Sequence, residues 1–403
     1  MRINSKLFSL LLITFALPLF GVFLVACDPS AHSIDSKITY LKLNSTILLP
    51  ASNAILPWPP LPEQASISVL GIGKIGDFND SAPIPIASVA KIMTALVVLK
   101  DHPLKLGSQG PLLTMTAQDA DYFGTYLDRG GSVAKVVAGE QLSEYQLLQA
   151  LLVPSADNIA LTLAMWDAGS LNNFLAKMNA LAKELGATHT TYTDPSGYDP
   201  GTISTASDQV LIGEKAMSDP SVAQIVATNH LEFPVAGWLP NYNPLVGYQG
   251  VNGVKSGYTE QAGGCLVFSA TRNVGTTPVT VVGAVLGYKG GGALHAVGMQ
   301  TLALLNAVYS SLQVVPVTPP SGHVAKIEAP WGQSAYASAD PSQLTTVAYP
   351  GETLSYSFQA NALNVGTLAK GIRVGTLTAS NSMGVVATFP VTLDSELTQP
   401  DIQ

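Results

Sequence analysis

Residues 83–100, PIPIASVAKIMTALVVLK, constrain the fold more than any other stretch of this sequence. The two prolines before Ser88 favour an extended entry, and the residues after it are good helix formers without a breaker. The remaining positions are apolar all round, a pattern typical of a helix enclosed on every side. The sequence therefore predicts a domain built around a buried central helix, with Ser88 in its first turn.

Ser88 and Lys91 form a Ser-x-x-Lys pair at the start of this predicted helix. At positions i and i+3 the two side chains share a helix face, so the amine can reach the hydroxyl. Burial penalises the charged form of a lysine, so part of Lys91 should be a neutral amine able to take a proton from Ser88. The same spacing recurs at Ser132 and Lys135, but in a strand-like setting, where i and i+3 point to opposite faces.

Composition limits the classes of function. The chain has 403 residues, 47% hydrophobic and 11% charged, which favours packed domains with little disorder. Its net charge of -8, without a Lys/Arg cluster, argues against a nucleic-acid partner. The six histidines lack the spacing of zinc ligands, and there is no P-loop and no G-x-S-x-G elbow. We therefore predict neither a metal nor a cofactor.

The N-terminus indicates export. Arg2 and Lys6 precede an apolar run over 7–26 that ends at Cys27. Residues 24–27, LVAC, resemble the lipobox of bacterial lipoproteins, whose cysteine is lipidated after cleavage. The alternative is an uncleaved membrane anchor, since the run is long enough to span a bilayer. In both cases the remainder of the chain would be extracytoplasmic, attached to the membrane and facing the cell wall.

The sequence also predicts how the chain is divided. After a signal peptide over 1–26, residues 27–64 read as a stalk, 65–312 as the main domain opening with a β-hairpin, 313–322 as a proline-rich linker, and 323–403 as a small antiparallel β domain. Within the main domain, residues 119–139 read as loop and short strand, with scattered glycines and polar residues. The second cysteine, Cys265, lies in an apolar run and is expected to be a buried thiol.

A polar cluster lies between two predicted helices, 142–153 and 159–166. It contains Ser155, Asp157 and Asn158 directly after a proline. Such a cluster is either a helix cap or part of a functional site, and its position alone favours the cap.

A third group of polar residues precedes two predicted strands. It consists of Lys255, Ser256, Gly257, Tyr258 and Thr259. A lysine and a hydroxyl on a strand edge, beside a glycine that lets a backbone approach closely, suit recognition of a carboxylate. The alternative is an ordinary turn lysine.

The three groups follow one another in the order Ser-x-x-Lys, Ser-x-Asp and Lys-Ser-Gly, an order found in penicillin-binding proteins. The wording PIASVAKIMTALVVL, LLQALLVPSADNIALTLA, DPSGYDPGTISTASD and VKSGYTEQAGGCLVFSATR resembles the serine D-Ala-D-Ala carboxypeptidases, the low-molecular-mass penicillin-binding proteins. The likeness covers about 65–306, and KGIRVGTLTASN and FPVTL are similar to that family's C-terminal domain. It implies an α+β fold, an antiparallel sheet flanked by helices with Ser88 on the central helix, plus a small C-terminal all-β domain.

The resemblance also implies roles for the reacting groups. Ser88 would be the acylated nucleophile and Lys91 its base. Ser155 would relay a proton to the leaving D-alanine. The backbone N–H groups of Ser88 and Tyr258 would form the oxyanion hole.

The same resemblance assigns the substrate's terminal carboxylate to Lys255 and Ser256, with a further contact from Thr259. One departure concerns the middle motif, where the family usually has Asn third. Here Asp157 is third and Asn158 follows. Either the amide role passes to Asn158, or a carboxylate faces the site and favours the charged forms of the two lysines, raising the pKa of Lys255.

The activity implied is removal of the terminal D-alanine from peptidoglycan stem peptides through an acyl-enzyme, with β-lactam antibiotics as covalent inhibitors. DD-endopeptidase action on cross-links is a variant of it. A β-lactamase would need a deacylating Glu in a Glu-x-x-Leu-Asn setting, which Glu184, followed by LGAT, does not fit. A non-catalytic cell-wall-binding lipoprotein is the alternative from another class, if Asp157 disables the site.

Overall fold

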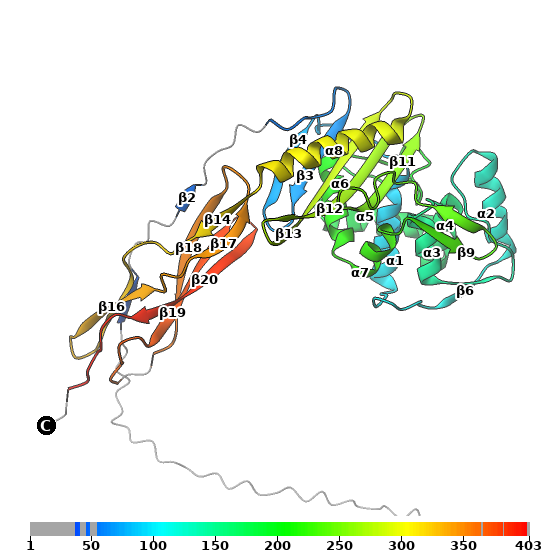
Figure 1. Ribbon diagram of the computed structural model, residues 1–403. Coiled ribbons are helices and arrows are strands. Elements are labelled where there is room, and N and C mark those ends of the chain that lie inside the picture. Colours follow the sequence, from blue (N-terminus) through cyan, green and yellow to red (C-terminus); the bar gives the residue numbers. More distant parts are fainter. Residues whose placement is uncertain (1–36, 41–45, 49–54, 364–365, 382, 401–403) are drawn as a thin grey trace, which may run out of the picture.

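The computed structural model describes residues 37–40, 46–48, 55–363, 366–381 and 383–400. It contains an α+β domain and an all-β domain at opposite ends of an elongated molecule (Figure 1). This is the fold class that the sequence predicts. The N-terminal apolar run and Cys27 lie outside the described residues. No helix in the described ranges combines the length and the apolar character needed to cross a bilayer.

The α+β domain is organised around a five-stranded antiparallel sheet, and the predicted hairpin at its start is the β3–β4 pair. In spatial order the strands are β11 (Val251–Thr259), β12 (Gly263–Val274), β13 (Thr277–Tyr288), β3 (Gln64–Val69) and β4 (Gly73–Phe78). β11 is an edge strand, so one of its sides is open to other elements. The Lys-Ser-Gly segment lies on this edge, as predicted.

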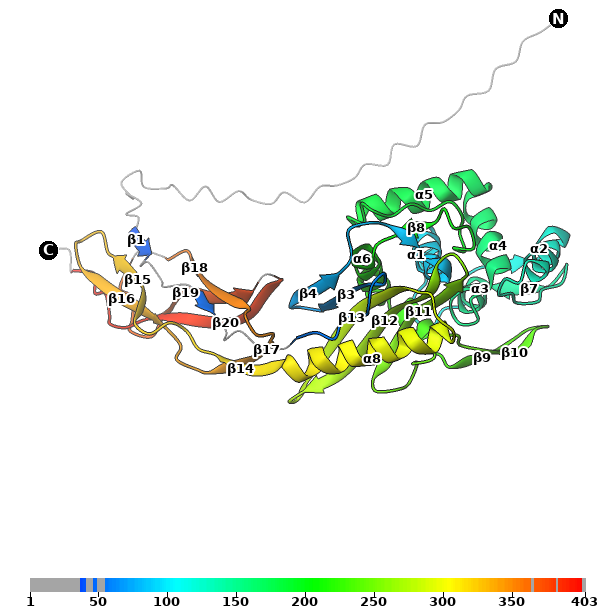
Figure 2. The same cartoon turned by 90° about the horizontal axis from the view of Figure 1, so that it is seen from above.

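Helices cover both faces of the sheet, with α8 on one face and α1 and α6 on the other (Figure 2). The helices are α1 (Lys91–Asp101), α2 (Ala117–Asp128), α3 (Glu144–Leu152), α4 (Asp157–Ala168), α5 (Leu171–Glu184), α6 (Ala206–Met217), α7 (Pro220–Val226) and α8 (Ala293–Ser311). Three two-stranded sheets complete the domain. They pair β5 (Ile84–Pro85) with β8 (Ile203–Ser204), β6 (Leu112–Thr114) with β7 (Gln141–Ser143), and β9 (His230–Phe233) with β10 (Gly237–Pro240).

Strand alternation explains why the sheet has a hydrophobic core on each face. Along β12, Cys265 and Val267 belong to the core that contains α1, whereas Leu266 and Phe268 belong to the core that contains α8. Successive side chains of a strand point to opposite faces, so a continuous apolar run fits a sheet covered on both sides. Cys265 is fully buried, as predicted, and burial raises the pKa of its thiol to about 12.

The central helix is α1, and each of its residues from Lys91 to Leu99 is buried. Ser88 lies one turn earlier than this α-helix, in the 3₁₀ turn η1 (Ala87–Ala90). The backbone N–H of Lys91 donates to the carbonyl of Ser88, which closes that tighter turn. The predicted helix is therefore confirmed, with its first turn in 3₁₀ geometry.

Two local expectations are wrong. Residues 119–139 include the helix α2, which begins with a reciprocal capping box between Thr116 and Asp119 and continues through a mid-helix glycine. The second Ser-x-x-Lys copy is not on a strand, because residues 131–137 have no regular secondary structure. Their backbone is held instead by a side chain, since the amide of Asn158 accepts from Ala134 N and donates to Ala134 O.

The C-terminal domain is an antiparallel sheet around its own hydrophobic core, as the sequence predicts. In spatial order its strands are β1 (Lys37–Tyr40), β15 (His323–Glu328), β16 (Ser334–Ala339), β20 (Gly384–Leu393), β19 (Arg373–Asn381), β18 (Thr353–Ala360) and β2 (Thr46–Leu48). The side chain of Asn381 donates to the carbonyl of Gly71 at 3.0 Å, a contact between the two domains.

The structure differs from the expected linkers in two places. β1 and β2 lie within the predicted stalk, 27–64, yet they pair with β15 and β18. The segment 313–322, expected to be a linker, begins with β14 (Gln313–Val317), which pairs with β17 (Leu344–Ala348). Its valines favour a strand, and a two-stranded sheet consists only of edges, where a proline such as Pro316 is tolerated.

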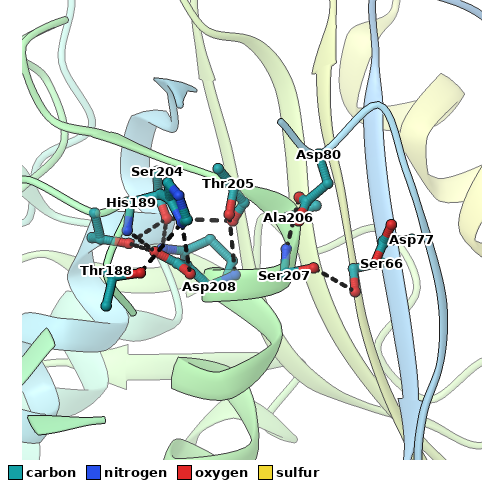
Figure 3. Close-up of polar contacts among 12 residues, drawn as sticks. Ser66, Asp77, Asp80, Thr188, His189, Ser204, Thr205, Ala206, Ser207 and Asp208 are labelled. Atoms are coloured by element: carbon teal, nitrogen blue, oxygen red, sulfur yellow. Dashed lines mark hydrogen bonds and ion pairs between the residues drawn. The ribbon is translucent and has the colours of Figure 1, made fainter. Parts of the chain in front are cut away.

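Hydrogen bonds join the start of α6 to the loop that follows β4 and to the loop before the helix (Figure 3). Ser207 N donates to Asp80 Oδ1 at 2.9 Å. The carboxylate of Asp208 accepts from His189 N at 2.8 Å and from the Thr190 hydroxyl at 2.7 Å. These bonds satisfy backbone groups at a helix start and in a loop, and they place the segment that leads from α5 to α6.

Glu144, in the first turn of α3, is a buried acid that forms no ion pair with any residue the structure describes. Its side chain is 1% exposed, and Oε1 has no hydrogen-bond partner among the described residues. Burial raises the pKa of this carboxyl to about 7. A folded-state pKa above the unfolded value means that the folded protein holds the proton longer, so stability falls as pH rises through 4.5 to 7.

We therefore predict that Glu144→Gln stabilises the protein more at pH 8.5 than at pH 5. The gain in free energy of unfolding over the unsubstituted protein should be about 2–3 kcal/mol larger at pH 8.5. Urea unfolding at the two pH values measures this. The exposed Glu232, changed to Gln, is the matched control and should show no such gain. Equal effects of both substitutions at both pH values would contradict the assignment.

Candidate active site

Ser88 and Lys91 meet at the entrance to the central helix. Lys91 Nζ lies 2.8 Å from Ser88 Oγ, and Lys91 is fully buried. The residue before the serine, Ala87, has a φ of +50°, a conformation that costs a non-glycine residue free energy. The turn is thus held by its surroundings and presents the hydroxyl beside the amine.

Lys91 makes two more contacts besides that with Ser88. Its Nζ donates to Asp157 Oδ1 at 2.5 Å and to the carbonyl of Ser196 at 2.9 Å. The carboxylate oxygen and the carbonyl can only accept, so each uses one N–H of the amine. The third N–H group of the Lys91 nitrogen points at Ser88 Oγ.

The middle cluster is part of this site and is not a helix cap. α4 begins at Asp157, but its N-cap residue, Ala156, makes no side-chain capping bond. Ser155 has a φ of +65°, and its buried Oγ has no hydrogen-bond partner within the described ranges. Asn158 points away from the site to Ala134. The sequence left two interpretations of an Asp at position 157 in place of Asn. The structure agrees with the second, because the carboxylate of Asp157 faces Lys91.

Sequence reasoning missed a residue that organises the loop on which Lys91 depends. The carboxylate of Asp194 accepts from the backbone N–H groups of Ser196 and Tyr198 and from the hydroxyl of Thr202. These bonds fix the turn that aims the carbonyl of Ser196 at Lys91. The DPSG wording is a typical Asx-turn signal, and it could have identified Asp194.

The Lys-Ser-Gly segment of β11 runs beside Ser88. A Cβ built on Gly257 would lie 2.6 Å from the backbone N of Ser88, so only glycine permits this approach. Lys255 and Ser256 are buried, and Lys255 Nζ donates to the carbonyl of Ser256 at 2.8 Å. Ser256 Oγ, like that of Ser155, has no partner among the described residues.

Two lysines and one carboxylate share this dry site. Burial lowers the pKa of Lys255 well below its usual value, the charge of Lys91 lowers it further, and Asp157 opposes both effects. The net shift is opposite to the upward shift expected from Asp157, because desolvation of a fully buried amine outweighs a carboxylate that pairs with the other lysine. Burial raises the pKa of Asp157, and the charge of Lys91 opposes that rise.

The site opens into a cleft of about 510 Å³. Its walls come from the Ser88 turn, the segment after α2, the Asp194 loop and the end of β11. The lining residues are Ser88, Arg129, Gly130, Gly131, Ser132, Asp157, Tyr198, Pro200, Tyr258, Thr259, Glu260 and Gln261.

Several of these wall residues were not identified from the sequence. They belong to the segment after α2 and to the Asp194 loop, and only the fold brings these segments to the cleft. Arg129 and Ser132 follow α2, a helix that the sequence did not predict. Tyr198 donates its hydroxyl to the carbonyl of Arg129 at 2.6 Å, which joins two of the walls. Among the described residues, no group of three or more His, Cys, Asp and Glu could hold a metal ion.

The chain is similar in sequence to known proteins over part of its length. The chain is 34% identical to the D-alanyl-D-alanine carboxypeptidase DacC of Escherichia coli over 236 residues, 57% of this chain and 56% of DacC. It is 26% identical to DacF of Bacillus subtilis over 64% of each chain. The matches thus span less than two thirds of the length of these relatives.

Solved structures support the fold. Penicillin-binding protein 5 from Haemophilus influenzae superimposes with a TM-score of 0.60 at 20% identity, covering 86% of this chain and all of that one. The Streptomyces K15 DD-transpeptidase gives a TM-score of 0.53 at 27% identity, covering 60% of this chain and 95% of that one. The model of the peptidase S11 family matches residues 73–288, more than half of the 403 residues. This chain therefore belongs to the peptidase S11 family, described as D-alanyl-D-alanine carboxypeptidase.

Proposed function

We propose that this protein is a serine D-Ala-D-Ala carboxypeptidase, which removes the terminal D-alanine of peptidoglycan stem peptides through an acyl-enzyme on Ser88. The observation that carries the proposal is the 2.8 Å contact between Ser88 Oγ and the buried amine of Lys91 at the base of a cleft. The unpartnered hydroxyls of Ser155 and Ser256 support it. Buried hydroxyls without partners cost free energy unless a ligand satisfies them.

Acylation begins at the Ser88 hydroxyl. Its oxygen bonds to the carbonyl carbon of the penultimate residue as its proton passes to Lys91, the base within reach. The backbone N–H groups of Ser88 and Tyr258 stabilise the oxyanion that forms, an effect typically worth a few kcal/mol. Gly257 lets β11 lie close enough to Ser88 for both N–H groups to point at one oxygen.

The substrate's free terminal carboxylate is the feature that this end of β11 recognises. Lys255 and the hydroxyl of Ser256 supply a cation and a donor, and Thr259 adds a second hydroxyl at the cleft wall. Ser155 carries a proton from the lysines to the amine of the leaving D-alanine. Water then attacks the acyl-enzyme and regenerates Ser88.

The setting of this activity is extracytoplasmic. Several relatives bear the name D-alanyl-D-alanine carboxypeptidase, and the peptidoglycan stem peptides proposed here as substrate lie outside the cytoplasm. The chain would be held at the membrane by a lipid on Cys27 or by its uncleaved apolar N-terminus. β-Lactam antibiotics would acylate Ser88 in the same way as the peptide, and they serve as probes of the site.

We predict that penicillin adds one drug mass to the folded protein lacking residues 1–27, and that Ser88→Ala abolishes this adduct together with D-alanine release from a D-Ala-D-Ala peptide. Intact-mass spectrometry and a D-alanine assay measure the two. Lys135→Ala is the control, because it removes the exposed lysine of the second Ser-x-x-Lys copy and should leave the adduct intact. An adduct on Ser88→Ala would refute Ser88 as the nucleophile.

A further prediction concerns the approach of β11. Gly257→Ala should slow acylation by about 100-fold or more, because its Cβ pushes the strand away from Ser88 and breaks the oxyanion hole. The rate of labelling by fluorescent penicillin measures this. Gly291→Ala is the matched control, since a Cβ there meets nothing within 4 Å. Similar labelling rates in both variants would exclude the proposed oxyanion hole.

A further inference from the structure

We propose that Asp157 is the proton acceptor for Lys91, so that the base that activates Ser88 is the Lys91–Asp157 pair and not the amine alone. This inference rests on the proposed acylation of Ser88.

The contacts of Lys91 create the need for a second acceptor. Lys91 Nζ donates to three oxygens, which uses the three N–H groups of an ammonium, and an ammonium group has no lone pair for the proton of Ser88. Its three N–H groups point at Ser88 Oγ, the Ser196 carbonyl and Asp157 Oδ1. A carbonyl does not take up a proton under these conditions, so Asp157 is the one contact of Lys91 that can relieve it of one.

The surroundings of Asp157 make such a transfer feasible. Its side chain is almost fully buried, and burial raises the pKa of the carboxyl, which brings its proton affinity nearer to that of an amine. The charged and titratable groups that face it are Lys91 from α1, Lys255 from β11, Asp194 from the loop before α6 and Tyr126 from α2. Of these four groups, Lys91 is the one that hydrogen-bonds to the carboxyl of Asp157, which also has a hydrogen bond with the backbone of Ser132.

The step balances without any other reactant. Lys91 gives one proton to Asp157 Oδ1, which neutralises the carboxylate and frees a lone pair on the amine. The O–H bond of Ser88 then breaks as its oxygen bonds to the substrate carbonyl carbon, and its proton moves to that lone pair, so the lysine is again an ammonium group. When the C–N bond breaks, the proton returns through Lys91 and leaves on the amine of D-alanine.

A pH profile separates this role from a structural one. In the unsubstituted protein, the rate of acylation should decrease at low pH only where the Lys91–Asp157 pair takes up one more proton. That proton binds to the carboxyl of Asp157, so the acid limb of the profile reports its titration. In Asp157→Asn the amide cannot take a proton, so Lys91 must itself be neutral to act. Because an amine binds its proton more tightly than a carboxyl, the acid limb should move to higher pH.

The experiment measures the rate constant for labelling by fluorescent penicillin between pH 6 and 9.5, with circular dichroism melts at each pH. We expect the acid limb of Asp157→Asn to lie about one pH unit or more above that of the unsubstituted protein, with labelling about tenfold slower for each pH unit below it. Labelling should recover toward the unsubstituted rate above the limb, which also shows that the variant is folded. Asp199→Asn, a carboxylate-to-amide change at an exposed residue of the Asp194 loop, should leave the limb in place.

Three outcomes would overturn the proposal. They are an unchanged limb, a limb displaced to lower pH, and a uniform loss of labelling at every pH, the last of which indicates a structural role. Absence of labelling in the unsubstituted protein is a different result, because it contradicts the proposed function and not the role of Asp157 within it.

Discussion

The burial of a lysine amine inside a helical core is the constraint on which the rest of this structure depends. An unpaired charge at that depth would cost several kcal/mol, and removing one partner of a buried pair typically costs about 3–5 kcal/mol. Asp157 and the carbonyl of Ser196 meet that requirement. Each is in turn held by other elements, since Asp157 N donates to the carbonyl of Ser132 and the Ser196 turn is fastened by Asp194. Three segments far apart in sequence therefore converge on one nitrogen.

Burial also affects the two lysines of the site differently. Lys91 has a carboxylate at 2.5 Å, whereas Lys255 has only a carbonyl within hydrogen-bond distance among the described residues, and its pKa is lowered. Two ammonium groups in one buried site repel each other, so a charge on one favours the neutral form of the other. Burial and the charge of Lys91 thus both favour the neutral form of Lys255, and the carboxylate of a bound substrate would oppose them.

Much of this site was visible in the sequence because its main elements are local. The apolar run after Ser88 predicted a buried helix, and a spacing of three residues placed Lys91 next to the serine whichever partners enclose them. Contacts between distant segments were not visible. The role of Asp157 depends on which way the first turn of α4 faces, and its position between two predicted apolar helices favoured a cap instead. The α2 helix was missed because Gly124 and its polar neighbours imitate a loop, although the Thr116 capping box marks its start.

The two domains were separable by composition, but their connections were not. β1 and β2 complete the C-terminal sheet from the segment expected to be a stalk, and strands of three or four residues are stabilised by pairing with their neighbours. The chain passes through strands of the β domain before it reaches β3, and it leaves the α+β domain through α8 and β14 (Figure 1). It therefore runs between the two domains twice, and the hydrogen bond from Asn381 to the carbonyl of Gly71 joins them as well.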